Sequence, residues 1–207
     1  MKFTPNLYTV AAPSGGGKTS LIDALLKRDE RISLSISHTT RPPRPGEVDK
    51  VHYFFTDPET FNRLVAENAF LEHATVFGHL YGTGRDPVMK MLREGHDVML
   101  DIDWQGAAQV RESFPSSCSI FILPPSLPEL RARLSRRGQD KPEVIDKRMR
   151  EAQAEISHYA EFDFCVINDV FEDALDDLHS IIRNRAPRRR GQEKRLGPLL
   201  AELLETV

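Results

Sequence analysis

The segment from Ala12 to Thr19, APSGGGKT, carries the pattern of a phosphate-binding loop, because it lies between an apolar run and a helix-like run. Glycines let successive backbone N–H groups turn toward anionic oxygens, and a helix N-terminus adds the positive end of its dipole. We expect Lys18 to reach the β- and γ-phosphates and Thr19 to offer its hydroxyl to Mg²⁺. Ala12 stands where the strict pattern has glycine, so the match is to a relaxed version. A glycine-rich turn that holds nothing is the alternative, and the flanking elements favour a bound nucleoside triphosphate.

A second anion site is indicated by Arg41 and Arg44, which flank a stiffening Pro-Pro pair. Two guanidinium groups in fixed relation suit a small phosphate monoester. Tyr53 and Tyr81 are expected to donate their phenol groups to the same phosphate. Two arginines alone are also typical of a solvated basic loop, so this prediction depends on its neighbours.

Glu72 lies in a strand-like run between apolar residues, where a carboxylate must face solvent or be paired. Guanine offers adjacent N1–H and N2–H₂ donors that a carboxylate accepts as a pair, and adenine does not. We expect the hydroxyls of Ser37 and Thr83 to read the remaining edge of the base. A solvent-facing strand glutamate is the alternative for Glu72 alone.

Asp101 and Asp103 end an apolar strand on the same face. A carboxylate in that place beside a phosphate loop often organises Mg²⁺ through water. Asp103 also suits the N-cap of the next helix, so Asp101 is the stronger metal candidate.

Residues 126–158 are rich in charge and are expected to be continuously helical, with arginines at Arg133, Arg136, Arg137 and Arg148. Phosphoryl transfer requires positive charge over the transferring group and exclusion of water. An arginine-bearing lid meets both requirements, while a solvated, salt-bridged helix is the default interpretation of such charges.

Strands and helices alternate around these residues, which predicts an α/β fold with a parallel sheet flanked by helices. Apolar runs typical of buried parallel strands occupy residues 7–12, 97–103, 118–124 and 162–168. Helical periodicity occupies residues 18–27, 106–114, 127–137 and 170–184. Helix starts are predicted at Asp57-Pro58, at Asp86-Pro87 and at Ser126, which has capping-box spacing to Glu129. Residues of about 34–90 break the rhythm with short alternating strands at 33–38, 52–55 and 70–77.

Composition limits the partners of this 207-residue chain. A net charge of −3 gives no global basic footprint for nucleic acid, and no apolar run approaches the length of a membrane span. Two cysteines in apolar runs, without a secretion signal, favour a reducing cytoplasm over a disulfide. The tail after residue 195 repeats leucine at helical spacing, and we favour its folding back on the chain over its packing against a second subunit.

The motifs SGGGKT, SHTTRPPRPGEVD, HYFF, FLEHATVFGHLYGT, LDIDWQG, RRG and DKRM together resemble guanylate kinase in order and spacing. The resemblance covers residues of about 8–185, and its most specific part is the nucleotide-binding insertion. It implies a P-loop NTPase fold with a core (1–33, 95–125 and 159–207), a GMP-binding insertion (34–94) and a helical lid (126–158). The implied reaction is Mg²⁺-dependent, reversible transfer of the ATP γ-phosphoryl group to GMP or dGMP, giving ADP and GDP in purine nucleotide metabolism. The partners implied are these nucleotides, with no membrane or specific nucleic acid, in a monomer or a homo-oligomer formed through the C-terminal region.

The same resemblance implies roles for individual residues. The ATP-binding set is Ala12, Pro13, Ser14, Gly15, Gly16, Gly17, Lys18, Thr19, Ser20, Arg133 and Arg137. The GMP-binding set is Ser37, Arg41, Arg44, Tyr53, Glu72, Tyr81, Thr83 and Asp101. The catalytic set is Lys18, Arg41, Arg137 and Arg148, and the metal set is Thr19 and Asp101. The departures from the family pattern, Ala12, Lys50 and Leu80, remove no charge or hydroxyl that the chemistry requires.

Three other functions stay open at this point. Guanylate-kinase-like scaffold domains bind phosphopeptides without catalysis, but they typically lose the lysine that Lys18 supplies here. A kinase for a phosphorylated ribose keeps the loop and lid but does not need Glu72. A nucleic-acid-binding role depends on the short basic run at residues 183–195, in a chain that is otherwise acidic.

Overall fold

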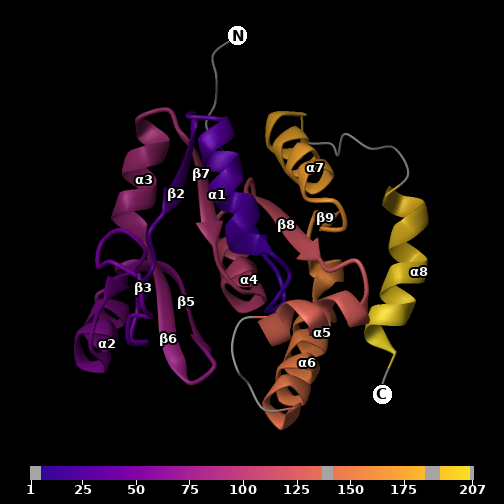
Figure 1. Ribbon diagram of the computed structural model, residues 1–207. Helices are drawn as coiled ribbons and strands as arrows, with labels where there is room; N and C mark the ends of the chain where they lie inside the picture. Colours follow the sequence, from indigo (N-terminus) through magenta and orange to yellow (C-terminus); the bar gives the residue numbers. More distant parts are fainter. Residues whose placement is uncertain (1–5, 137–141, 185–191, 206–207) are drawn as a thin grey trace. The chain divides into compact units, whose positions relative to one another are not determined.

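The computed structural model describes residues 6–136, 142–184 and 192–205 (Figure 1). The chain forms two compact units. The first contains residues 1–10 and 29–119, and the second contains residues 11–28 and 120–207.

Parallel strands form one part of the first unit, in the order β2-β7-β1: β2 (Ile32–Ser35), β7 (Asp97–Asp101) and β1 (Leu7–Ala11). Ile32 lies opposite Asp97, and Leu7 lies opposite Val98. Every residue of β1 is buried, as are the first four of β7. Strands buried on both faces are typical of a parallel sheet covered by helices, which confirms the expected fold class.

A second sheet of the same unit has the order β4-β3-β6-β5: β4 (Phe54–Phe55), β3 (His38–Thr39), β6 (His79–Gly84) and β5 (Phe70–Val76). Strands β5 and β6 form an antiparallel hairpin closed at Phe77-Gly78, where both φ angles are positive. A two-residue turn of that kind matches the twist of the strands. The prediction of one alternating strand over residues 33–38 was wrong, because the chain changes partner after Ser35, from β7 to β6.

Helices of the first unit are α2 (Pro58–Ala66), α3 (Arg85–Arg93) and α4 (Trp104–Ser113). The carboxylate of Asp57 accepts a hydrogen bond from the N–H of Thr60 at 2.8 Å, which confirms the predicted cap of α2. Asp103 accepts in the same way from the N–H of Gly106 at 2.9 Å and caps α4.

The predicted start of α3 at Asp86-Pro87 was wrong. The helix begins at Arg85, and Gly84 is the N-cap residue without a side-chain cap. The N–H of Arg85 donates to the carbonyl of Ala69 at 2.8 Å. This bond holds the backbone of Arg85 against the residue that precedes β5. The helix therefore begins one residue before Asp86, which cannot act as its cap.

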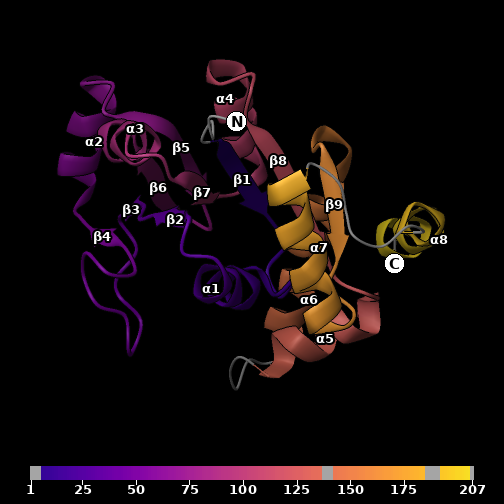
Figure 2. The ribbon, with the colours of Figure 1, turned by 90° about the horizontal axis from the view of Figure 1, so that it is seen from above.

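The second unit contains β8 (Cys118–Leu123), whose residues from Ile120 belong to it, and β9 (Phe164–Ile167). The two strands run parallel, with Ile120 opposite Phe164. Its helices are α1 (Lys18–Arg28), α5 (Leu127–Arg136), α6 (Pro142–Ile156), the 3-10 turn η1 (Tyr159–Glu161), α7 (Phe171–Asn184) and α8 (Gln192–Leu204). Helix α7 packs beside α1 (Figure 2), where Arg28 and Asp176 form an ion pair at 2.6 Å.

The charged segment predicted as one helix contains α5 and α6, and residues 137–141 between them lie outside the described residues. Ser126 accepts the N–H of Glu129 at 3.2 Å, which confirms half of the predicted capping box. The carboxylate of Glu129 instead accepts from Arg133.

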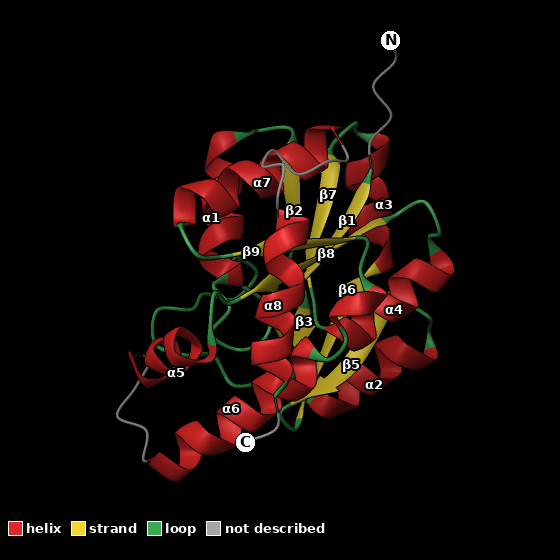
Figure 3. Ribbon diagram, turned by 90° about the vertical axis from the view of Figure 1, so that its right-hand side faces the viewer, coloured by secondary structure: helices red, strands yellow, loops and turns green. Residues whose placement is uncertain are grey.

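The leucine-rich tail folds back on its own unit (Figure 3). Leu199, Leu200 and Leu203 of α8 are buried, and the helix contacts α6 and β9. Gln153 donates to the carbonyl of Leu203 at 3.2 Å, and Glu202 accepts from the N–H of Leu127 at 3.3 Å. Three leucines of the predicted stripe are therefore buried within the unit, as expected for a tail that folds back on the chain, while Leu204 is exposed.

Both cysteines are free thiols, with Cys118 buried and Cys165 half-buried. Within the described ranges, no helix is long and apolar enough to cross a lipid bilayer.

Candidate active site

The glycine-rich segment forms a turned loop that leads into α1. The N–H of Gly16 donates to the carbonyl of Pro13 at 2.8 Å, and Gly15 and Gly17 have φ angles of +87° and +91°. Residues with a Cβ rarely adopt such angles, so the loop's curvature depends on these glycines. Lys18 follows as the first residue of α1, which places it at the positive end of the helix dipole.

Two side chains that the sequence did not indicate brace this loop within the second unit. The carboxylate of Glu155, near the end of α6, accepts the N–H of Ser14 at 2.9 Å. The amide of Asn168, just after β9, donates to the carbonyl of Gly16 at 2.9 Å. A Cβ on Gly17 would lie 2.2 Å from Nδ2 of Asn168, so the amide packs directly against the loop.

Arg133 connects the loop region to α5. Its Nε donates to Glu129 at 2.8 Å and its Nη2 donates to the carbonyl of Asn168 at 3.0 Å. Its Nη1 is buried and has no hydrogen-bond partner among the described residues. Arg133 and Asn168 line a cavity of about 280 Å³ together with Gly15, Gly17, Ser20, Arg136, Asp169 and Phe171. Nη1 of Arg133 lies 3.9 Å from the place of a Cβ on Gly17, so an unused cationic donor lies beside the loop where the sequence predicts ATP to bind.

The other residues predicted for the donor side are distributed over α1 and α6. Thr19 and Ser20 are exposed in the first turn of α1, and Lys18 is half-buried. Arg148 is half-buried in α6. Arg137 lies outside the described residues, so its predicted role stays a prediction.

The three residues predicted to read a guanine base lie together in the first unit. The hydroxyl of Thr83 donates to Oε1 of Glu72 at 2.5 Å and lies 3.3 Å from the hydroxyl of Ser37. All three are buried, and Glu72 is only 3% exposed. Glu72 and Thr83 are cross-strand partners in the β5–β6 hairpin. The alternative of a solvent-facing glutamate is therefore wrong.

A glycine makes room for this carboxylate. A Cβ on Gly106, in the first turn of α4, would lie 2.4 Å from Oε2 of Glu72. The carboxylate is thus held between β6 and the backbone of α4, which restricts its rotation. Asp101 ends β7 and is half-buried, and Asp103 is engaged in capping α4.

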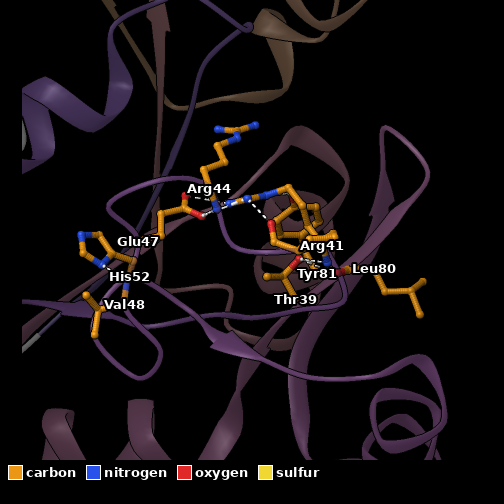
Figure 4. Close-up of polar contacts among 9 residues, drawn as sticks. Thr39, Arg41, Arg44, Glu47, Val48, His52, Leu80 and Tyr81 are labelled. Carbon is orange, nitrogen blue, oxygen red and sulfur yellow. Dashed lines mark hydrogen bonds and ion pairs between the residues drawn. The ribbon is translucent and has the colours of Figure 1, made fainter.

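The predicted monophosphate site is centred on Arg41, which is 9% exposed (Figure 4). Its Nε donates to the hydroxyl of Tyr81 at 3.1 Å, and its guanidinium carbon lies 5.4 Å from the ring centre of Tyr53. Tyr81 and Thr83 are two residues apart on β6 and so face the same side of the sheet. The groups predicted for the phosphate and for the base therefore share one face, about 7 Å apart along the strand. Arg44 is exposed, and Figure 4 shows its guanidinium extending away from Arg41.

Glu47, which the sequence analysis did not select, completes this group. Its carboxylate accepts from Nη1 and Nη2 of Arg41 at 2.9 and 2.8 Å. The hydrogen bond from Arg41 is the main cause that lowers the pKa of Glu47 below its ordinary value, and the same contact raises the pKa of Arg41. Both groups therefore stay charged at neutral pH.

The residues missed by the sequence analysis gave unequal signals. Asn168 ends an apolar strand run, and side chains at the carboxyl ends of parallel strands commonly face a ligand. Glu47 follows a proline-rich turn after two arginines, which is a weaker indication. Glu155 is one carboxylate among many on a charged helix, and nothing in the sequence distinguishes it.

Comparison with known proteins shows the family of the chain. A family profile described as guanylate kinase matches residues 4–185. The chain is 59% identical over 201 residues to a guanylate kinase of Alkalilimnicola ehrlichii, with 97% of each chain covered. It is 54% identical over 200 residues to a guanylate kinase of Escherichia coli strain K12, covering 96% of this chain and 97% of the other. A crystal structure of guanylate kinase from Anaplasma phagocytophilum superimposes with a TM-score of 0.76 at 33% identity, covering 96% of each chain. The chain therefore belongs to the guanylate kinase family.

Proposed function

We infer that the chain catalyses reversible transfer of the γ-phosphoryl group of ATP to GMP, giving ADP and GDP. The observation that carries this inference is the buried chain of Ser37, Thr83 and Glu72. A kinase for a sugar phosphate has no use for a buried carboxylate at this place. A carboxylate buried in a protein needs hydrogen-bond donors, and guanine supplies two adjacent ones.

We propose that Glu72 accepts the N1–H and N2–H₂ groups of guanine and that Ser37 and Thr83 read the neighbouring edge. The donation from Thr83 holds one carboxylate oxygen, and the backbone of Gly106 confines the other. Adenine presents an acceptor at N1 and would face the carboxylate with like charge. The proposed site would therefore reject AMP because bound AMP would leave buried polar groups without hydrogen-bond partners. Such a site discriminates more strongly than a hydrophobic pocket that selects by shape.

We propose that the phosphate of GMP binds to Arg41, Arg44, Tyr53 and Tyr81. The hydroxyl of Tyr81 already accepts from Arg41, so its own hydrogen remains available to donate to a phosphate oxygen. Arg44 follows Arg41 across the Pro-Pro pair, and its exposed side chain can approach a ligand from solvent. These groups would hold the acceptor oxygen in place, and positioning supplies much of the rate enhancement in phosphoryl transfer.

We propose that the ATP phosphates lie on the loop from Ala12 to Ser20, with Lys18 and Arg133 as cationic contacts. Nη1 of Arg133 is buried without a partner among the described residues and lies beside the loop, which supports a ligand contact there. Arg148, together with Arg137, would stabilise the transferring group from the lid.

Mg²⁺ fits this chain as an ion carried by the nucleotide. The described residues contain no group of three or more His, Cys, Asp or Glu side chains that could hold a metal ion. Mg²⁺ usually keeps several waters and binds through one or two protein oxygens plus substrate phosphates. Thr19, exposed at the start of α1, would supply one of those oxygens, and the predicted role of Asp101 in holding the ion stays a prediction. When bound, the ion would neutralise the charge on the phosphates.

Two further proposals concern the compartment and the sugar of the acceptor. The free thiols of Cys118 and Cys165 support work in a reducing cytoplasm. None of the described residues proposed for the GMP site is assigned to a ribose hydroxyl, so GMP and dGMP are both proposed as acceptors.

Steady-state ADP formation with GMP, AMP and ribose 5-phosphate as alternative acceptors tests the proposed function. We expect turnover with GMP and at least 10³-fold lower kcat/KM with AMP, in line with sites that hydrogen-bond a substrate group. Preferred turnover of the sugar phosphate would replace this proposal with a sugar-phosphate kinase. Binding of a phosphopeptide without turnover of any acceptor would indicate a scaffold domain instead.

A further inference from the structure

The guanidinium of Arg41 is almost completely engaged by the protein itself (Figure 4). Nε donates to Tyr81, Nη1 donates to the carbonyl of Pro42 at 2.7 Å and to Glu47, and Nη2 donates to Glu47. An arginine side chain has five N–H groups, so these contacts use one at Nε, two at Nη1 and one at Nη2. One N–H of Nη2 remains for a ligand. The orientation of this side chain is therefore fixed before any substrate binds.

Glu47 is itself held in place independently of Arg41. Its Oε2 accepts the backbone N–H of Arg44 at 2.6 Å, and its own N–H donates to the carbonyl of Arg44 at 3.0 Å. The turn continues through Val48, whose N–H donates to Nδ1 of His52 at 3.0 Å. The carboxylate thus has donors from both Arg41 and the turn backbone, and displacing it would leave the Arg44 N–H without its acceptor.

We propose that Glu47 is a positioning residue of the GMP phosphate site, acting through Arg41 on Tyr81. This inference rests on the proposed function. Glu47 holds the two terminal nitrogens of Arg41, and the Nε of the same group then fixes the oxygen of Tyr81 at 3.1 Å. With that oxygen accepting from Arg41, the phenol hydrogen is directed away from Arg41. The remaining Nη2 hydrogen and the Tyr81 hydrogen are then two preorganised donors for one phosphate group.

An opposite role for Glu47 has a distinct physical signature. A carboxylate that merely occupies the guanidinium until substrate arrives would compete with the phosphate, and its removal would tighten GMP binding. Three hydrogen bonds from two partners favour retention of Glu47 over displacement. The sign of the change in GMP affinity therefore decides between the two roles.

The experiment measures dissociation constants of GMP and of guanosine by isothermal titration calorimetry, for the full-length wild type and for Glu47→Gln and Glu47→Asp, and that of AMP for the wild type. Guanosine lacks the phosphate, so it reports the base site alone. We expect both variants to lose GMP affinity by about 10-fold or more, because charge-assisted bonds that orient Arg41 are lost or mis-spaced. Guanosine affinity should change by less than about 2-fold. Glu67→Gln, an exposed carboxylate of the same unit, is the matched control.

A double-mutant cycle tests whether Glu47 acts through Arg41. In an Arg41→Ala background, Glu47→Gln should cause no further loss of GMP affinity. Tighter GMP binding by Glu47→Gln would overturn the proposal in favour of a competing carboxylate. Equal losses for GMP and guanosine would also overturn it, because they would indicate a structural role. A wild type that binds GMP no better than AMP would instead refute the proposed function, from which this inference follows.

Discussion

Replacing Glu72 by glutamine tests the guanine-binding site most sharply. The substitution keeps the size of the side chain and an oxygen that can still accept from the hydroxyl of Thr83. It replaces the other oxygen with an NH₂ group, which would then face a donor of guanine. The Gly106 backbone lies close to this group, since a Cβ there would lie 2.4 Å from Oε2, and it restricts how far the amide can turn away.

The expected loss follows from these contacts. A hydrogen bond to a charged group contributes roughly 1.5–3 kcal/mol, and a buried donor without an acceptor costs about 1–3 kcal/mol more. Together they amount to about 2.5–6 kcal/mol in the transition state, and each 1.4 kcal/mol corresponds to a factor of about ten. We therefore expect Glu72→Gln to lower kcat/KM for GMP by roughly 10²- to 10⁴-fold, mainly through KM. Adenine has an acceptor at N1, to which the amide NH₂ could donate where the carboxylate would repel it, so rejection of AMP should relax.

The assay is initial-rate ADP formation with GMP and with AMP, and with ATP varied at saturating GMP. The KM for ATP should stay within about 2-fold of wild type, because Glu72 lies in the first unit and the phosphate loop lies in the second. Glu67→Gln makes the same charge change at an exposed position and should behave as wild type. An unchanged ratio of GMP to AMP turnover in a folded Glu72→Gln protein would refute the assignment.

Three other predictions concern the second unit and one matched position in the first. Lys18→Ala should lower kcat by a factor of roughly 10² to 10³ with the fold retained in circular dichroism, and near-wild-type turnover would remove Lys18 from the phosphate site. Gly17→Ala should lower kcat/KM for ATP by at least about 10-fold, because its Cβ would meet Asn168 at 2.2 Å. Gly95 is the matched control, with a similar φ of +93° and nothing within 4 Å of a Cβ. Gly95→Ala should therefore lower only the stability of the protein, measured by urea unfolding. Burial raises the pKa of Cys165 from 9.0 to about 11. Its thiolate fraction at pH 8 is therefore about 100-fold lower than that of an ordinary thiol, and labelling followed by mass spectrometry should be correspondingly slow until the pH nears 11.

Local signals explain why much of the fold was predictable. The parallel strands are nearly continuous apolar runs, and the glycine-rich segment leads directly into α1 as the pattern requires. The caps at Asp57 and Ser126 depend on groups three residues away, so sequence spacing reveals them. The grouping of Ser37, Glu72 and Thr83 was partly predictable, because a carboxylate between apolar residues must either face solvent or be paired.

Contacts between distant segments were not predictable in the same way. The start of α3 depends on a hydrogen bond from Arg85 to Ala69, sixteen residues earlier, which no cap rule includes. Glu155 braces Ser14 across 141 residues of sequence, and Asn168 reaches Gly16 across 152. Their residue types are common on helices and at strand ends, so only the fold reveals their partners.

The destination of the phosphoryl group tests the central claim most directly. ATP labelled with ³²P at the γ-position is incubated with the wild-type protein, Mg²⁺ and GMP, and the products are separated by ion-exchange chromatography. We predict that the label appears in GDP, that little is released as inorganic phosphate, and that no transfer occurs when GMP is omitted. Label released as inorganic phosphate at the same rate with and without GMP would contradict the account, because the chain would then be a nucleoside triphosphatase and not a GMP kinase.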